Sequence, residues 1–138
     1  MKQFSVRILY TMLRVSNLEK SISFYCETLG MRLQRREEYP DGKFTLAFVG
    51  YGDEANESTI ELTYNWGVEK YEKGNAYGHI ALGVENLNEY CEYLKSKNVK
   101  FIRDPGVMKF TSPQRDRPES IAFIQDPDGY KIEIIEVH

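Results

Sequence analysis

Three side chains of metal-ligating type stand on strand-like segments of the sequence: Glu61, His79 and Glu133. Each glutamate has branched apolar neighbours on both sides, which is the pattern of a strand with a carboxylate on one face. Taken alone, such a glutamate usually faces solvent, and a single histidine is usually a surface or core residue. If two carboxylates and an imidazole gathered at one buried point, the two carboxylates would repel each other and lose hydration unless a cation lay between them. These residue types therefore suit a divalent ion with open water positions, namely nickel, cobalt, manganese or zinc.

An internal repeat places the two glutamates at equivalent positions. The segment that starts at Tyr10 aligns without a gap with the segment that starts at His79, and Glu133 stands where Glu61 stands in the first copy. Repeats of this kind indicate two related structural units. A pseudo-twofold relation between the halves, or between two chains, would bring Tyr10 with His79 and Glu61 with Glu133 to one point.

Each copy predicts one βαβββ module, with boundaries at about 7–66 and about 76–138. A short apolar strand is followed by an Asn-Leu pair, in which Asn17 or Asn86 is a good N-cap, and then by an amphipathic helix. The apolar positions of the two helices are Leu18, Ile22, Tyr25 and Leu29 in the first copy, and Leu87, Cys91 and Leu94 in the second. We therefore expect an α+β fold, a single domain of residues 1–138, with antiparallel-rich mixed sheets and one helix per module.

Turn residues separate the expected strands. Pro40-Asp41-Gly42 and the D-P-D-G sequence at 126–129 are strong turn signals. Residues 105–119, which include three prolines, are expected to form a long irregular loop.

Bulk composition excludes several classes of partner. The 138 residues carry 18 basic and 21 acidic side chains, for a net charge of −3, and the charges are interspersed along the chain. This pattern lacks the concentrated positive charge that binds nucleic acid or an anionic membrane. No stretch approaches the roughly 20 apolar residues of a membrane span, and Arg7 interrupts the N-terminal apolar run. Cys26 and Cys91 have no metal-ligand spacing, so we expect a cytoplasmic protein in a reducing compartment.

The successive segments of the chain resemble one enzyme family. YTMLRV, LGM, FVGYG, IELTYNWGVEKY, AYGHIALGV and AFIQDPDGYKIEI together are similar to glyoxalase I, or lactoylglutathione lyase, of the vicinal oxygen chelate superfamily. The resemblance implies methylglyoxal detoxification, by isomerisation of the methylglyoxal-glutathione hemithioacetal to S-lactoylglutathione. It also implies carboxylate-mediated proton transfer through a metal-bound enediolate, with Glu133 as the main base and Glu61 as its counterpart.

The resemblance implies metal ligands at Tyr10, Glu61, His79 and Glu133, and it favours nickel or cobalt, with zinc also possible. The family has histidine or glutamine where Tyr10 stands, and a phenol must ionise before it binds a metal strongly. One interpretation is an active enzyme with three protein ligands and water. The alternative is a metal-poor, catalytically impaired binding protein of the same fold. Another metalloenzyme of the superfamily, such as an epimerase or a dioxygenase, is expected to need a second well-placed histidine.

The resemblance also implies a substrate site and an assembly. Arg14 and Asn65 are the expected glutathione-binding residues, with Arg103 and Lys109 as further basic candidates. In this family the site lies between the subunits of a homodimer, so one chain supplies the first two ligands and its partner the last two. The only partner expected besides a second copy is the small-molecule substrate.

Overall fold

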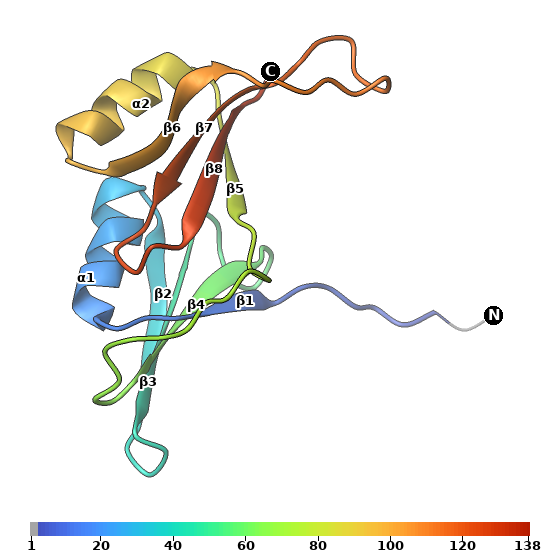
Figure 1. Ribbon diagram of the computed structural model, residues 1–138. Coiled ribbons are helices and arrows are strands. Elements are labelled where there is room, and N and C mark those ends of the chain that lie inside the picture. Colours follow the sequence, from blue (N-terminus) through green and yellow to red (C-terminus); the bar gives the residue numbers. More distant parts are fainter. Residues whose placement is uncertain (1–2) are drawn as a thin grey trace. The chain divides into compact units, whose positions relative to one another are not determined.

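The first half of the chain folds in the order strand, helix and three strands (Figure 1). Its elements are β1 (Tyr10–Arg14), α1 (Leu18–Ile22), the π-helix η1 (Ser23–Thr28), β2 (Arg32–Tyr39), β3 (Phe44–Gly50) and β4 (Thr59–Asn65). The sheet order is β1-β4-β3-β2, with β1 parallel to β4 and the other neighbours antiparallel. The predicted βαβββ topology of the first module is confirmed.

The second half repeats this topology. Its elements are β5 (Ile80–Val84), α2 (Leu87–Ser96), β6 (Lys100–Val107), β7 (Ser120–Gln125) and β8 (Lys131–Glu136). The sheet order is β5-β8-β7-β6, and β5 and β8 form the parallel pair. The expected α+β class, with mixed sheets and one helical segment per module, is confirmed.

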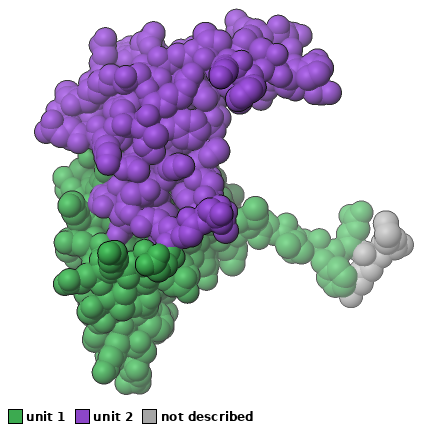
Figure 2. All heavy atoms as spheres, in the orientation of Figure 1, with its two compact units in different colours: residues 1–72 green, residues 73–138 purple. Residues whose placement is uncertain are grey.

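This computed structural model describes residues 3–138 and divides into two compact units, Met1–Glu72 and Lys73–His138 (Figure 2). Each predicted module, 7–66 or 76–138, falls within one unit. The organisation of both modules as a single domain stays a prediction. No helix within residues 3–138 is long and apolar enough to cross a membrane.

The helices begin at the predicted residues. The Asn17 side chain accepts a hydrogen bond from the Lys20 backbone N–H at 3.1 Å, and the Asn86 side chain accepts one from the Glu89 backbone N–H at 3.0 Å. These bonds satisfy N–H groups that have no partner within a first helical turn. The buried positions of the apolar stripes are Leu18, Tyr25 and Leu29 in the first unit and Leu87, Cys91 and Leu94 in the second.

Two local predictions were wrong. The first helix widens into a π-helix over Ser23–Thr28, which apolar spacing over so few residues does not distinguish from an α-helix. The expected loop at 105–119 is shorter, because β6 continues to Val107 through two irregularities in its pairing with β7. Pro105 has no backbone N–H to donate to a neighbouring strand. It fits in β6 because β6 lies at the edge of the sheet and its pairing with β7 is irregular there. The irregular segment is therefore 108–119.

Candidate metal centre and active site

One face of the first sheet carries two of the four predicted ligand positions. The parallel register places Met12 opposite Glu61, so Tyr10 and Arg14 lie on the same face of the sheet as Glu61. The alternating burial of β1 agrees, because Leu13 is 4 % exposed while Tyr10 is 43 % exposed. The local alternation of β1 and β4 is what directs these side chains to one side.

Glu61 is a buried carboxylate on the same face of the sheet as the exposed Tyr10 side chain. Its exposed fraction is 8 %. Burial raises the pKa of the Glu61 carboxyl, while the Thr63 hydroxyl and the Arg35 guanidinium partly offset this effect and Glu37 adds to it. A buried carboxylate without a complete counter-charge is a group that a bound cation would stabilise.

The ring of Tyr10 reaches across the sheet above β4. Tyr10 is on β1 and Phe48 is on β3, and β4 lies between them. Their ring centroids are nevertheless only 5.1 Å apart, in an edge-to-face arrangement with an interplanar angle of 77°. Phe48 is paired directly with Glu61 in the antiparallel register. The two rings therefore cover the strand that carries Glu61, which contributes to the burial of its carboxylate.

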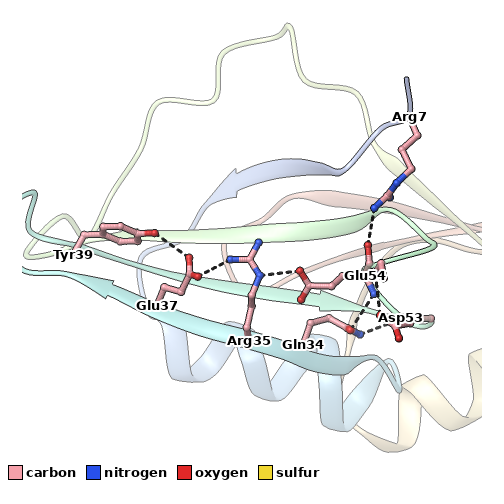
Figure 3. A network of polar contacts seen from close by, with 9 residues as sticks. Arg7, Gln34, Arg35, Glu37, Tyr39, Asp53 and Glu54 are labelled. Carbon is pink, nitrogen blue, oxygen red and sulfur yellow. Dashed lines mark hydrogen bonds and ion pairs between the residues drawn. The ribbon is translucent and has the colours of Figure 1, made fainter. Parts of the chain in front are cut away.

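Arg35 on β2 is a site-face residue that the sequence did not single out. Its Cζ lies 3.7 Å from the centroid of the Phe48 ring. The guanidinium pairs with Glu37 at 2.8 Å and with Glu54 at 2.8 Å, as Figure 3 shows. Arg35 thus places a positive charge on the Glu61 face and holds Phe48 from its other side. The signal that could have found it is the alternation Arg35, Glu37, Tyr39 along β2, once the register with β3 is known.

The predicted glutathione residues of the first unit have different surroundings. Arg14 is exposed at the end of β1 and pairs in register with Thr63. The Asn65 side-chain amide donates a hydrogen bond to the Tyr71 hydroxyl at 3.1 Å. Both residues lie on the face of Glu61, and their binding role stays a prediction.

The second unit brings together the other two predicted ligands. His79 Nε2 lies 3.1 Å from Glu133 Oε1. The parallel pairing of β5 with β8 places Ala81 opposite Glu133, and His79 shares the face of Ala81 because it precedes that residue by two. The His79 ring also packs edge-to-face on Phe123, with centroids 5.2 Å apart. The His79 side chain is 41 % exposed and the Glu133 side chain is 13 % exposed, so a reacting molecule can approach both.

The Arg103 guanidinium binds backbone carbonyls around the irregular end of β6. It donates hydrogen bonds to the carbonyl oxygens of Asp104, Gly106, Val107 and Ile121. These bonds satisfy acceptors that the broken ladder leaves open. The structure therefore gives Arg103 a local structural role, and its proposed contact with glutathione stays a prediction.

Lys109 lies in the irregular segment 108–119. Its Nζ is 5.7 Å from the centroid of the neighbouring Phe110 ring, which is 71 % exposed. The role predicted for Lys109 in binding glutathione also stays a prediction.

The four predicted ligand positions are divided equally between the two units. Within residues 3–138 of one chain, no three His, Cys, Asp or Glu side chains form a group able to hold a metal ion. The donor types nevertheless fit a divalent cation, because two carboxylates and one imidazole supply hard and borderline ligands and leave coordination positions open. The assembly of Glu61 with His79 and Glu133 stays a prediction.

Comparison with known proteins gives consistent matches over nearly the whole chain. Residues 7–134 match the model of the Glyoxalase/Bleomycin resistance protein/Dioxygenase superfamily. The chain is 53 % identical over 129 residues to a probable lactoylglutathione lyase of Synechocystis, a match that covers 94 % of each protein.

Solved structures give the same result. Glyoxalase I from Zea mays superposes with a TM-score of 0.84 at 41 % identity, over 95 % of this chain and 44 % of the maize chain. This chain therefore spans less than half the length of that relative. The trypanothione-dependent glyoxalase I of Leishmania major superposes with a TM-score of 0.79 at 41 % identity, over 96 % of this chain and 87 % of that one. The chain belongs to the lactoylglutathione lyase, or glyoxalase I, family of this superfamily.

Proposed function

We propose that this protein is a metal-dependent lactoylglutathione lyase, which isomerises the hemithioacetal of methylglyoxal and glutathione to S-lactoylglutathione. The observation that carries the proposal is the 3.1 Å contact between His79, which directly precedes β5, and Glu133 on β8. This pair sets a metal-ligating imidazole beside a carboxylate that can act as a base, in a chain that belongs to the glyoxalase I family.

Glu61, His79 and Glu133 would hold one divalent ion, for which nickel or cobalt is favoured and zinc is possible. When bound, the ion supplies Lewis acidity that makes the carbon-bound proton of the hemithioacetal more acidic. The protein contributes by holding the ligand side chains on strands β4 and β8 and at the start of β5, so that they need little rearrangement during the reaction.

Glu133 is the proposed base. A carboxylate next to the substrate accepts the proton from one carbon and returns it to the adjacent carbon, which completes the isomerisation without net loss of a proton. Glu61 is the proposed counterpart on the opposite side of the site. Its burial raises the pKa of its carboxyl, and a higher pKa makes a carboxylate a stronger proton acceptor.

Arg14 and Asn65 are proposed to bind glutathione, because they share the Glu61 face and carry the right donors. A guanidinium can hold one of the glutathione carboxylates with two parallel hydrogen bonds. Arg103 and Lys109 are the further candidates. Arg103 would have to give up hydrogen bonds to backbone carbonyls to bind substrate, which makes it the less favourable of the two.

The proposed assembly is a homodimer with its sites between subunits. Tyr10 and Glu61 of one chain would face His79 of the partner subunit and Glu133 of the partner subunit. This proposal is testable by mixing inactive Glu61→Gln and Glu133→Gln proteins under conditions that exchange subunits. A mixed dimer would have one site with both substitutions and one intact site, so activity should return. Activity that stays lost would place each complete site within one chain.

The proposed compartment is the cytoplasm. Glutathione and reduced thiols are abundant there, and Cys26 and Cys91 are both free.

Proton nuclear magnetic resonance of a mixture of protein, methylglyoxal and glutathione in deuterium oxide tests the function directly. The proposal predicts protein-dependent formation of the lactoyl thioester, with partial deuterium at the carbon that receives the proton if the base exchanges with solvent. Absence of the thioester with every metal would reject the function. It would support the alternative that Tyr10 motivates, a binding protein of the same fold.

A further inference from the structure

We propose that Tyr10 acts as a catalytic hydrogen-bond donor to a substrate oxygen and does not serve as a metal ligand. This inference rests on the proposed function and names the task of the residue that stands at the unusual ligand position. It follows from how the ring is held, from what its hydroxyl contacts, and from the chemistry of a phenol beside a developing negative charge.

The Tyr10 ring is held by contacts that do not involve its hydroxyl. It packs edge-to-face on Phe48 at 5.1 Å, and Phe48 is only 2 % exposed. Phe48 also contacts the Arg35 guanidinium, which lies 3.7 Å from the ring centroid and is itself paired with two carboxylates. A side chain fixed through its ring can present its polar end to a ligand without paying for reorganisation.

The Tyr10 hydroxyl is available for a ligand. Among residues 3–138 it makes no hydrogen bond. The residue is 43 % exposed even though its ring reaches over β4. Other tyrosines of the first unit use their hydroxyls within the protein: Tyr39 donates to Glu37 and Tyr51 donates to the Leu29 carbonyl. Tyr10 differs from them in offering an unused donor on the face of Glu61.

A phenol in this position is better suited to donate a hydrogen bond than to bind a metal. To be a strong ligand it must lose its proton, whereas as a donor it keeps the proton and needs no base. The hemithioacetal gains negative charge on its oxygens as the carbon-bound proton leaves for Glu133. A donor aimed at such an oxygen stabilises the transition state more than the ground state. Tyr10 transfers no proton in this step, so the proton balance between the two carbons is unchanged.

The Tyr10→Phe protein separates the two roles, because phenylalanine keeps the ring contact with Phe48 and removes only the hydroxyl. We expect kcat/KM to fall on the order of 10- to 100-fold, as for loss of one hydrogen bond to a charged oxygen. Cobalt affinity, measured by competition with a chromophoric chelator, and the cobalt absorption spectrum should not change. Binding of S-methylglutathione should also be unchanged, because this ligand lacks the two reacting oxygens.

Two further variants complete the experiment. Tyr93→Phe removes an exposed phenol from α2 and should behave as wild type, which controls for the loss of any surface hydroxyl. Tyr10→His introduces a neutral imidazole, and we expect it to bind cobalt at least about tenfold more tightly with an altered spectrum, because a further ligand is added.

Two results would overturn the inference while the wild-type enzyme is active. The first is a Tyr10→Phe protein with weakened cobalt binding and a changed spectrum, which would make Tyr10 a ligand. The second is a Tyr10→Phe protein with unchanged kcat/KM, which would leave the hydroxyl without a role. Failure of the proposed function would give a different result, because the wild-type protein would then form no thioester with any metal. In that case the inference about Tyr10 would also be rejected.

Discussion

His79 Nε2 lies 3.1 Å from Glu133 Oε1, although the two residues are far apart in the sequence. The parallel pairing of β5 with β8 brings them together, and the internal repeat makes this pairing the counterpart of β1 with β4. The same topology therefore places one pair of candidate ligands on one face of the sheet in each unit. What distinguishes the first pair is that Tyr10 replaces the imidazole and that its ring spans the strand of Glu61.

Replacing Glu133 with glutamine should remove the base and keep the shape of the side chain. We expect the rate of thioester formation to fall by about 10²- to 10⁴-fold, the usual contribution of a positioned general base. Glu92→Gln, on an exposed position of α2, is the control and should retain full activity. A Glu133→Gln enzyme with an undiminished rate would overturn the proposed mechanism.

Glu61→Gln should make the metal-free protein more stable while it weakens metal binding. Burial raises the pKa of Glu61 above its ordinary value of 4.5, so the folded protein holds this proton more tightly than the unfolded chain. The free energy of unfolding therefore falls as pH rises above that value, and a neutral glutamine removes the cost. Thermal melts in chelator at neutral pH should show a higher melting temperature for Glu61→Gln and no change for the exposed Glu38→Gln. A lower melting temperature for Glu61→Gln would contradict this account.

Arg103→Lys should destabilise the fold more than it affects substrate binding. A lysine cannot reach the four carbonyl oxygens that the guanidinium joins. Loss of several such bonds should lower the free energy of unfolding by about 1–3 kcal/mol in urea titrations. The matched change is Lys100→Arg on the same strand, which should be nearly neutral. A large rise in KM for glutathione hemithioacetal, without loss of stability, would instead assign Arg103 to the substrate.

Tyr77→Phe should change how stability depends on alkaline pH. Burial raises the pKa of Tyr77 to about 12, and the negative charge of Asp126 and the neighbouring Tyr130 phenol act in the same direction. The neutral phenol, which donates to the Lys131 carbonyl at 2.9 Å, therefore stabilises the fold fully below the ordinary pKa of 10.0. This contribution is lost as pH rises through about 12.

Urea midpoints measured across that pH range check the prediction. Wild type should lose stability more steeply than Tyr77→Phe, because phenylalanine cannot ionise. At neutral pH the variant should be less stable by about 1 kcal/mol, the usual net value of one hydrogen bond. Parallel pH profiles for the two proteins would show that Tyr77 does not titrate in this range.

The sequence predicted both modules because the internal repeat and the apolar periodicity give the same answer. Asn17 and Asn86 cap the helices as expected, since an Asn side chain accepts from the first-turn N–H groups wherever a helix starts after it. The π-helical turn and the extension of β6 through Pro105 were missed. Both depend on local hydrogen-bond geometry, which the spacing of apolar residues does not encode.

The candidate site was predictable only in part. Strand alternation was sufficient to place Tyr10 and Glu61 on one face, and His79 and Glu133 on another. Arg35 was missed because its position beside Phe48 depends on the pairing of β2 with β3, which is irregular between Leu33 and Arg35. A residue next to a bulge changes face relative to simple alternation, so one strand read alone does not locate it.

We propose that this chain performs glyoxalase I chemistry with a tyrosine at the first ligand position. Ultraviolet detection of thioester formation tests it most directly, using chelator-stripped protein re-supplied with nickel, cobalt, manganese or zinc in turn. Activity should be lost on stripping and should return on metal addition, most strongly with nickel or cobalt. A stripped protein that retains its full rate, or one that forms no thioester with any of the four metals, would contradict it.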